Sequence, residues 1–175
     1  MSKIAVALLH YPILNRHGET STTAITSIDV HDFARSCAFY DVDPVYLVHP
    51  APAMHALIDD MNDYYINGAG GDKKPARKIM LESIRCVYSL QDALDEADYQ
   101  LWYTSAEAPE AGSVDPSKLL EIEGNHLIVF GTGWGLDVKN LPPGNGWLSP
   151  IEGVGRVRHL SVRGALAIYL DRLRR

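Results

Sequence analysis

Short apolar runs alternate along the chain with segments in which apolar residues recur every three or four positions. The runs predict β-strands, because such runs between turn-forming residues are typical of buried strands. They fall at residues 4–9, 45–48, 84–88, 100–104, 126–130 and 147–148. The segments with three- and four-residue spacing predict helices. They fall at residues 29–40, 52–67, 75–82, 89–97, 116–121 and 161–173.

The alternation of strands with helices predicts an α/β fold with a mainly parallel sheet and helices on both of its faces. Asp29 is the expected N-cap of the first helix, and residues 11–27 before it are expected to form a polar loop. The glycines of residues 68–71 are expected to end the second helix. The last helix has no charged residue from 164 to 170, so we expect it to be largely buried.

The chain has 175 residues, of which 46% are hydrophobic and 22% charged, enough for one sizeable core and too few for two full domains. We therefore predict a single domain, residues 1–175. Cys37 and Cys86 form no CxxC pair, so neither a disulfide framework nor a zinc site is indicated, and a cytoplasmic location is expected. The apolar run after Lys3 is too short for a signal sequence, and no run has the length of a membrane span.

Charge is unevenly distributed along this acidic chain, whose formal net charge is -6. Residues 156–175 contain six arginines and a single acid, Asp171. A second basic cluster consists of Lys73, Lys74, Arg77 and Lys78. Either cluster is consistent with a solvated helix face or with a surface that contacts RNA, and the counts do not separate the two interpretations.

Two glycine-rich segments follow predicted strand ends: Gly131, Gly133 and Gly135 come directly after an apolar run, and Gly153 and Gly155 follow later. Glycine lets a backbone approach a ligand closely, so the two segments predict a site for a flat, nucleotide-like ligand. The GxGxG spacing and the prolines at 142–143 disfavour a dinucleotide-binding unit, although a nicotinamide site stays an alternative. No GxxxxGK[ST] motif is present, so a P-loop is not predicted.

The sequence gives weaker signals for other kinds of catalytic or metal-binding site. No serine lies in a GxSxG elbow, and the seven histidines show no HExxH spacing, so neither a serine hydrolase nor a metal site is predicted. Arg35 lies beside the apolar helix positions Ala34 and Ala38, where a guanidinium is usually avoided. It either holds a phosphate or a reacting oxygen at the strand edge, or pairs in the interior with an acid such as Asp32.

Three blocks of sequence, in order, carry a resemblance to a known family. They are Asp29-Val-His-Asp-Phe-Ala-Arg35 to Val42, Leu127-Ile-Val-Phe-Gly131-Thr-Gly133-Trp-Gly135-Leu136, and Leu148-Ser-Pro-Ile151 through His159-Leu-Ser161-Val162. They resemble the SPOUT superfamily of S-adenosylmethionine (SAM)-dependent RNA methyltransferases. With Tyr11-Pro12 and the threonine-rich residues 22–26, the chain is similar to a bacterial subgroup of predicted RNA methyltransferases. Members of that subgroup stand alone or are fused to a tRNA guanine methyltransferase.

The resemblance implies a C-terminal trefoil knot, a homodimer with the active site near the subunit interface, and SAM held mainly by backbone groups. Ser161 is either part of the cofactor site or only the N-cap of the last helix, and Trp134 either walls the pocket or lies in the core. The residues implied for cofactor binding are Thr104, Ser105, Gly131, Gly133, Trp134, Leu148, Ile151, Leu160 and Ser161.

The implied reaction is transfer of the SAM methyl group to an oxygen or nitrogen of tRNA or rRNA. Because SAM is already activated, the protein mainly has to align the two centres and manage one proton. Arg35 is the expected catalytic residue, which positions the acceptor; for a nitrogen acceptor, Asp137 or Glu152 is available as the base. One alternative is a non-catalytic module that binds SAM or RNA for a partner enzyme, and another is a nicotinamide-dependent oxidoreductase.

Overall fold

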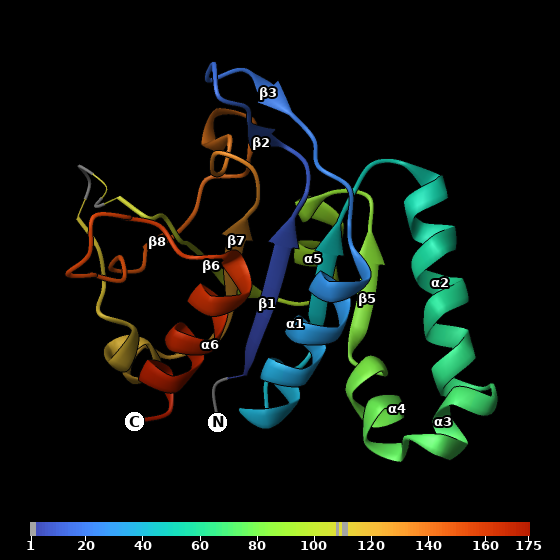
Figure 1. Cartoon of the computed structure of the whole chain (residues 1–175). Helices are drawn as coiled ribbons and strands as arrows, with labels where there is room; N and C mark the ends of the chain where they lie inside the picture. The colour runs from blue at the N-terminus through green and yellow to red at the C-terminus, as the bar shows by residue number, and fades with distance from the viewer. Residues whose placement is uncertain (1–2, 108, 110–111) are drawn as a thin grey trace.

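Six parallel strands form the central sheet of the computed structural model, which describes residues 3–107, 109 and 112–175 (Figure 1). The strands run in the order β5-β4-β1-β7-β6-β8, and every neighbouring pair is parallel. Their bounds are β1 Ile4–Leu9, β4 Val45–Val48, β5 Ile84–Val87, β6 Tyr99–Tyr103, β7 Asn125–Gly131 and β8 Gly146–Trp147. The predicted α/β fold with a mainly parallel sheet is confirmed.

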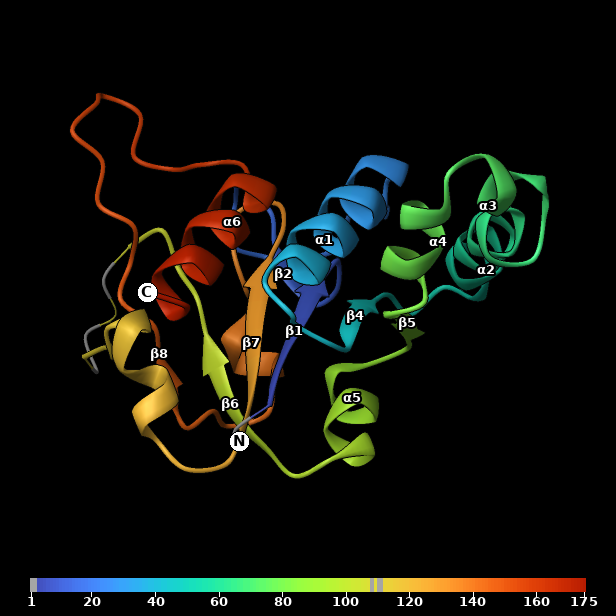
Figure 2. The ribbon, with the colours of Figure 1, turned by 90° about the horizontal axis from the view of Figure 1, so that it is seen from below.

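Helices cover both faces of this sheet, as predicted, but unequally (Figure 2). On one face lie α1, α2, α4 and α6, while α5 lies on the other. The α-helices are α1 Ser27–Phe39, α2 Pro52–Ile66, α3 Ala69–Lys73, α4 Pro75–Leu81, α5 Leu90–Glu96 and α6 Val162–Leu173. Two 3-10 helices are η1 Pro116–Glu121 and η2 Val138–Asn140.

Two hydrophobic cores lie on opposite faces of the sheet because side chains alternate along each strand. In β1, Val6 and Leu8 pack in the core under α1 and α6, whereas Ala7 and Leu9 face the core under α5. All of β1 is buried, as expected of a central parallel strand. No helix of the described residues is long and apolar enough to cross a membrane.

Three local predictions need correction. Thr26 is the N-cap of α1 and Asp29 is its partner three residues later, so the two form a capping box. Residues 68–71 do not simply end a helix, because Gly70 and Gly71 lie in α3; a Cβ on Gly70 would come within 2.6 Å of the Tyr64 ring. The expected polar loop contains a small antiparallel hairpin, β2 Ile13–Leu14 and β3 Thr20–Ser21.

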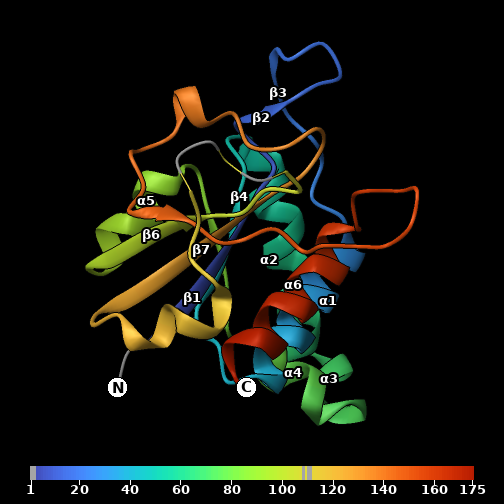
Figure 3. The same ribbon diagram turned by 90° about the vertical axis from the view of Figure 1, so that its left-hand side faces the viewer.

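The last helix is less buried than its lack of charge suggested. Leu166, Tyr169 and Leu170 are buried against the core, but Ala165 and Ile168 are only partly buried. Helix α6 lies beside α1 on the sheet, so its outer face is left uncovered within one chain (Figure 3).

Candidate functional site

The carboxyl ends of β6, β7 and β8 bring together three of the predicted cofactor residues. Thr104 donates both its backbone N–H and its hydroxyl to the carbonyl of Val129, at 3.1 and 2.8 Å. The backbone N–H of Leu148 donates to the carbonyl of Tyr103 at 2.9 Å. Thr104, Gly131 and Leu148 therefore end three neighbouring parallel strands, and such an edge is where ligands bind in open α/β sheets.

The glycine loop, residues 131–137, is held against the β2–β3 hairpin. Leu14 donates its N–H to the carbonyl of Gly135 at 2.8 Å, and Trp134 donates its N–H to the carbonyl of Leu14 at 3.0 Å. A Cβ on Gly131 would lie 2.9 Å from Leu136, and one on Gly133 would lie 2.6 Å from Ile13. The first two glycines are thus required by the packing of the loop itself, whereas a Cβ on Gly135 would meet no atom within 4 Å.

A chain of hydrogen bonds ties the same loop to the end of β1. The hydroxyl of Thr132 donates to the carbonyl of Leu9 at 3.0 Å, so it accepts from Thr23 at 2.5 Å. Because the Thr23 hydroxyl has donated its only proton to Thr132, it accepts from Nδ1–H of His10 at 2.9 Å. This order assigns His10 as the neutral Nδ1–H tautomer.

The environment keeps His10 neutral. The residue is 1% exposed, and Nε2 has no hydrogen-bond partner among the described residues. Burial is the main cause that lowers the pKa of His10 to about 4, partly opposed by Asp29 and reinforced by His49. His10 therefore acts as a fixed hydrogen-bond donor to the loop and carries no charge at neutral pH.

Asp137, one of the two carboxylates expected as a base, has a structural role at the end of the loop. It is 4% exposed and accepts from the Thr20 hydroxyl at 2.5 Å and from the Asn140 amide at 2.8 Å. The bond from Thr20, followed by that from Asn140, lowers the pKa of Asp137. A carboxylate stabilised in this way is a weak base. Glu152, by contrast, is exposed on the segment before α6.

Residues 149–161 form an irregular segment that extends from the strand ends before it enters α6 (Figures 2 and 3). Of the predicted cofactor residues, Ile151 is partly buried, whereas Leu160 is 52% exposed. Ser161 is the N-cap of α6 and accepts from the N–H of Gly164 at 3.2 Å. One chain alone therefore leaves Leu160 and Ser161 open to solvent.

An ion pair fixes the start of α6 to α1. Nη1 of Arg163 lies 2.9 Å from Asp29, and its Nε lies 3.4 Å from Asp32. Asp29 also accepts from Thr26, so the α1 capping box and the start of α6 share one carboxylate. Nothing in the sequence spacing pointed to this pair, which joins residues 134 positions apart.

Arg35 is exposed on α1, so the expected apolar surroundings were wrong. Its expected partner Asp32 instead binds Arg163, and the neighbouring Ala38 is exposed as well. Burial lowers the pKa of His31, and the positive charges of Arg77 on α4 and of Arg35 lower it further. Arg35 lies on the outward face of α1, on a helical stripe with Ile28 and Phe39, which are 56% and 80% exposed.

Trp134 is 72% exposed, so it does not lie in the core. Ser105 directly follows Thr104 and is partly buried, with its hydroxyl accepting from the N–H of Glu107 at 3.1 Å. No group of three or more potential metal ligands gathers among the residues that the structure describes.

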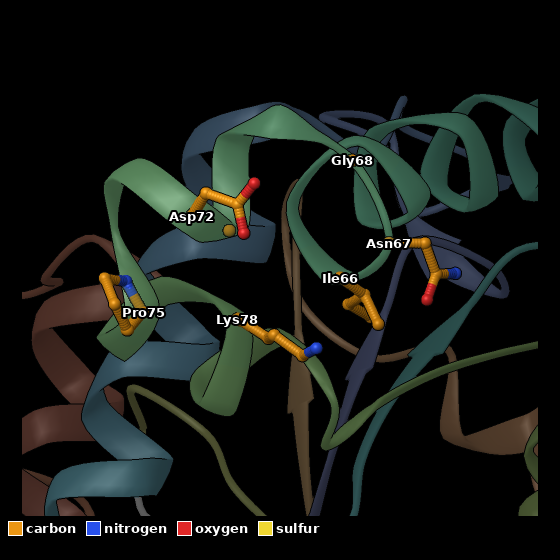
Figure 4. Close-up of a pocket in the computed structure, with 7 residues that line it drawn as sticks. Ile66, Asn67, Gly68, Asp72, Pro75 and Lys78 are labelled. Carbon is orange, nitrogen blue, oxygen red and sulfur yellow. The ribbon is translucent and has the colours of Figure 1, made fainter.

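A separate pocket of about 580 Å³ lies between α2, α3 and α4 (Figure 4). Asp72 and Lys78 bring opposite charges to it, beside Ile66, Asn67 and Pro75. It lies at the other end of the sheet from the glycine loop (Figure 1). It contains Lys78 of the second basic cluster but none of the predicted cofactor residues.

Comparison with known proteins adds an independent result. A family model described as SAM-dependent RNA methyltransferase matches residues 3–175. An uncharacterized protein of Aquifex aeolicus is 30% identical over 179 residues, covering 97% of this chain and 87% of that protein. A tRNA (guanine-N(1)-)-methyltransferase of Nitratidesulfovibrio vulgaris is 30% identical over 173 residues, covering 95% of this chain but only 41% of that enzyme. The chain thus spans less than half of that relative.

Solved structures share the fold at low sequence identity. A probable methylase family protein from Haemophilus influenzae matches with a TM-score of 0.64 at 19% identity, covering 99% of this chain and 65% of that one. The TrmH/SpoU tRNA modifying enzyme of A. aeolicus matches with a TM-score of 0.59 at 15% identity, covering 99% and 75%. The AdoMet-bound rRNA methyltransferase of Sinorhizobium meliloti matches with a TM-score of 0.61 at 16% identity, covering 98% and 56%.

Proposed function

Because the chain belongs to the family of SAM-dependent RNA methyltransferases, we propose that it transfers the methyl group of SAM to a nucleotide of tRNA or rRNA. The observation that carries this proposal is the family match over residues 3–175. The names of the tRNA-modifying and rRNA-modifying relatives support the choice of substrate class. The tRNA guanine methyltransferases are more than twice as long, so their guanine specificity is not carried over.

We propose that SAM binds at the ends of β6, β7 and β8, between Thr104, the glycine loop and the segment from Leu148 to Ser161. Neighbouring strand ends supply backbone groups there, and the side of Gly135 is open, which suits a flat adenosine. Bound SAM supplies an electrophilic methyl group. The residues of the chain have only to orient the cofactor, exclude water and align the acceptor. Ser105, Ile151 and Leu160 complete the proposed pocket.

We propose Arg35 as the residue that positions the RNA acceptor, by binding an adjacent phosphate or the acceptor oxygen. Its exposed position on the outer face of α1 suits contact with a group from outside the chain. For an acceptor that must lose a proton, Glu152 suits the role of base better than Asp137, which is engaged by Thr20 and Asn140.

We propose that the protein is a homodimer that pairs through the outer faces of α1 and α6. Ile28 and Phe39 expose apolar surface there, and a contiguous apolar patch is typical of an interaction site. Arg35 lies between them, so dimerisation would bring it to the subunit interface. Phe39→Ser is expected to yield monomers in sedimentation analysis, whereas Ile79→Ser, at an exposed apolar position of α4, leaves the mass unchanged. A wild-type monomer would contradict this.

We propose that residues 1–175 form one domain with a C-terminal trefoil knot, and that it acts in the cytoplasm. Val114 pairs with Leu148 and Ser113 bonds to Ser149, so the β6–β7 connection lies against the segment that enters α6. Pulling the termini apart on single molecules tests the knot. An unknotted chain extends to its full contour length, about 3.3–3.6 Å per residue, whereas a knotted chain stops short.

Titration calorimetry with SAM tests the cofactor site. Leu160→Asp puts a charge into the proposed pocket and is expected to abolish micromolar binding. Leu57→Asp, at a similarly exposed leucine of α2, is the matched control and is expected to bind like the wild type. Equal affinities for the two variants would place the cofactor elsewhere. Binding of NADH in place of SAM would support an oxidoreductase.

Methyl transfer from labelled SAM to total RNA of cells that lack the gene tests the reaction. Arg35→Ala is expected to remove transfer while SAM binding persists. Arg85→Ala, whose exposed side chain pairs with Glu96 near α5, is the control. Unchanged transfer in Arg35→Ala would refute the role of this residue. Binding of SAM without transfer by the wild type would favour the non-catalytic module.

A further inference from the structure

Trp134 presents its indole to solvent directly beside the proposed methyl-donor site. All three tryptophans lie in the described residues, and only Trp134 is largely exposed, at 72%. Trp102, in contrast, is 4% exposed and donates its ring N–H to His126 at 3.1 Å. A large exposed aromatic side chain on a functional loop is typical of a surface that binds a partner.

The backbone that carries this indole is fixed before any partner arrives. The N–H of Trp134 donates to Leu14, the preceding Gly133 packs on Ile13, and the following Gly135 accepts from Leu14. Ile13 is itself buried. A ring on such a scaffold loses little conformational freedom on binding, which favours affinity.

Basic side chains lie on the hairpin that is bonded to the loop and on the segment that follows the loop in sequence. The hairpin continues from Leu14 into its exposed tip, which carries Arg16 and His17. Nε–H of Arg16 donates to Nε2 of His17 at 2.9 Å, and the Asn15 side chain accepts from the N–H of His17 at 2.8 Å, so the tip is ordered. In the segment after the loop, Lys139 is exposed in η2.

The acids of the same surface are already engaged. Glu19 accepts from the Asn15 amide at 2.9 Å. Asp137 is buried and accepts from Thr20. The exposed groups of these segments include an aromatic face and cations, the combination that binds unpaired nucleotides through stacking and phosphate contacts.

We propose that Trp134 stacks on an unpaired base of the RNA substrate while Arg16 contacts a neighbouring phosphate. This inference rests on the proposed function and specifies its substrate as a single-stranded or looped nucleotide. A base inside a duplex has no free face for the ring. Trp134 follows Gly131 by three residues, so the stacked base is held on the loop that borders the proposed cofactor site.

Binding of a labelled, unstructured oligoribonucleotide, measured by fluorescence anisotropy, tests the proposal. Trp134→Ala is expected to weaken binding by about 5- to 150-fold, the effect of losing one stacked base. Trp134→Phe keeps most of the affinity. Leu57→Ala removes an exposed apolar side chain of α2 and is expected to change nothing. Arg16→Ala is expected to lower the slope of log affinity against log salt by about 0.7.

Two further measurements separate the alternatives. Molecular mass is expected to be the same in Trp134→Ala and the wild type, and RNA affinity is expected to fall more than SAM affinity. Lost SAM affinity with unchanged RNA binding would overturn the proposal and make Trp134 a wall of the cofactor pocket. Dissociation of the variant into monomers would overturn it in favour of a second copy of the chain covering the ring. RNA binding lost only in Trp134→Ala supports stacking, even if the wild type proves unable to transfer methyl groups.

Discussion

Replacing Gly133 by alanine tests whether the glycine loop is packed on the hairpin as the structure describes. Gly133 has φ +60°, a left-handed conformation that costs an alanine about 1–2 kcal/mol. A Cβ there would also meet Ile13 Cδ1 at 2.6 Å and the Leu14 carbonyl oxygen at 3.0 Å. Overpacking of a filled site costs about 1–3 kcal/mol. Because the end of the Ile13 side chain can move in part, we take about 1–2 kcal/mol as the cost of this contact. The free energy of unfolding should therefore fall by about 2–4 kcal/mol.

Gly18 supplies a matched control. It has φ +74° at the hairpin tip, but a Cβ there would meet no atom within 4 Å. Gly18→Ala therefore costs only the free energy of placing an alanine in the left-handed conformation, about 1–2 kcal/mol. Both substitutions restrict the unfolded chain equally, so that effect cancels in the difference. Urea unfolding with linear extrapolation measures both variants.

A second substitution isolates the contact itself. Ile13→Val removes Cδ1 and costs about 0.5–1.5 kcal/mol alone. In the Gly133→Ala background it should cost less, or even stabilise, because the alanine methyl fills the vacated space. Equal losses of stability in Gly133→Ala and Gly18→Ala, together with additive behaviour of Ile13→Val, would refute the packing of the loop on the hairpin.

Three further predictions concern the polar groups around the site. His10 has a pKa of about 4 when folded and an ordinary value near 6.5 when unfolded, so the unfolded state binds more protons between these values. The free energy of unfolding should fall by about 3 kcal/mol from pH 7 to pH 4, and less in His10→Asn, which keeps a donor for Thr23. Arg163→Gln leaves the buried Asp29 without its cation and should cost about 1–3 kcal/mol in urea unfolding. Tyr169→Phe removes the bond to the Ser149 carbonyl and should cost about 1 kcal/mol in the same assay.

Each of these three predictions has its own control. Arg175→Gln breaks an exposed pair with Asp171 and should change stability by less than about 0.5 kcal/mol; a cost equal to that of Arg163→Gln would contradict the special role of Asp29. Identical pH profiles of the wild type and His10→Asn would show that His10 does not titrate as described. Tyr64→Phe is the control for Tyr169→Phe, and equal effects would argue against a structural role for the bond to Ser149.

The strands could be predicted because parallel strands buried on both faces are continuous apolar runs, and the longer helices because burial of one face imposes a 3.6-residue period. The hairpin could not, since each of its strands has two residues and is held by contacts with the distant glycine loop. Helix α3 contains two glycines and depends on packing against Tyr64 and Tyr65, which no local propensity encodes.

The same contrast between predictable and unpredictable features holds for the candidate site residues. Thr104, Gly131 and Leu148 lie at neighbouring strand ends, because the carboxyl ends of adjacent parallel strands meet at one edge. Arg35 was expected among apolar neighbours because of Ala34 and Ala38, but alanine is common on both faces of a helix and Ala38 is exposed. Leu160 follows an irregular segment without periodicity, so its position had no sequence signal.

The bond between Thr20 and Asp137 joins residues 117 positions apart. Closing so long a loop loses chain entropy before any contact rewards it, and the pairing of β1 with β7 spans a similar separation, so we expect this bond to form no earlier than that pairing. During synthesis, the hairpin leaves the ribosome long before the glycine loop exists. A nascent or truncated chain consequently lacks the ordered loop and, with it, the proposed site for the methyl donor, which is complete only in the finished fold.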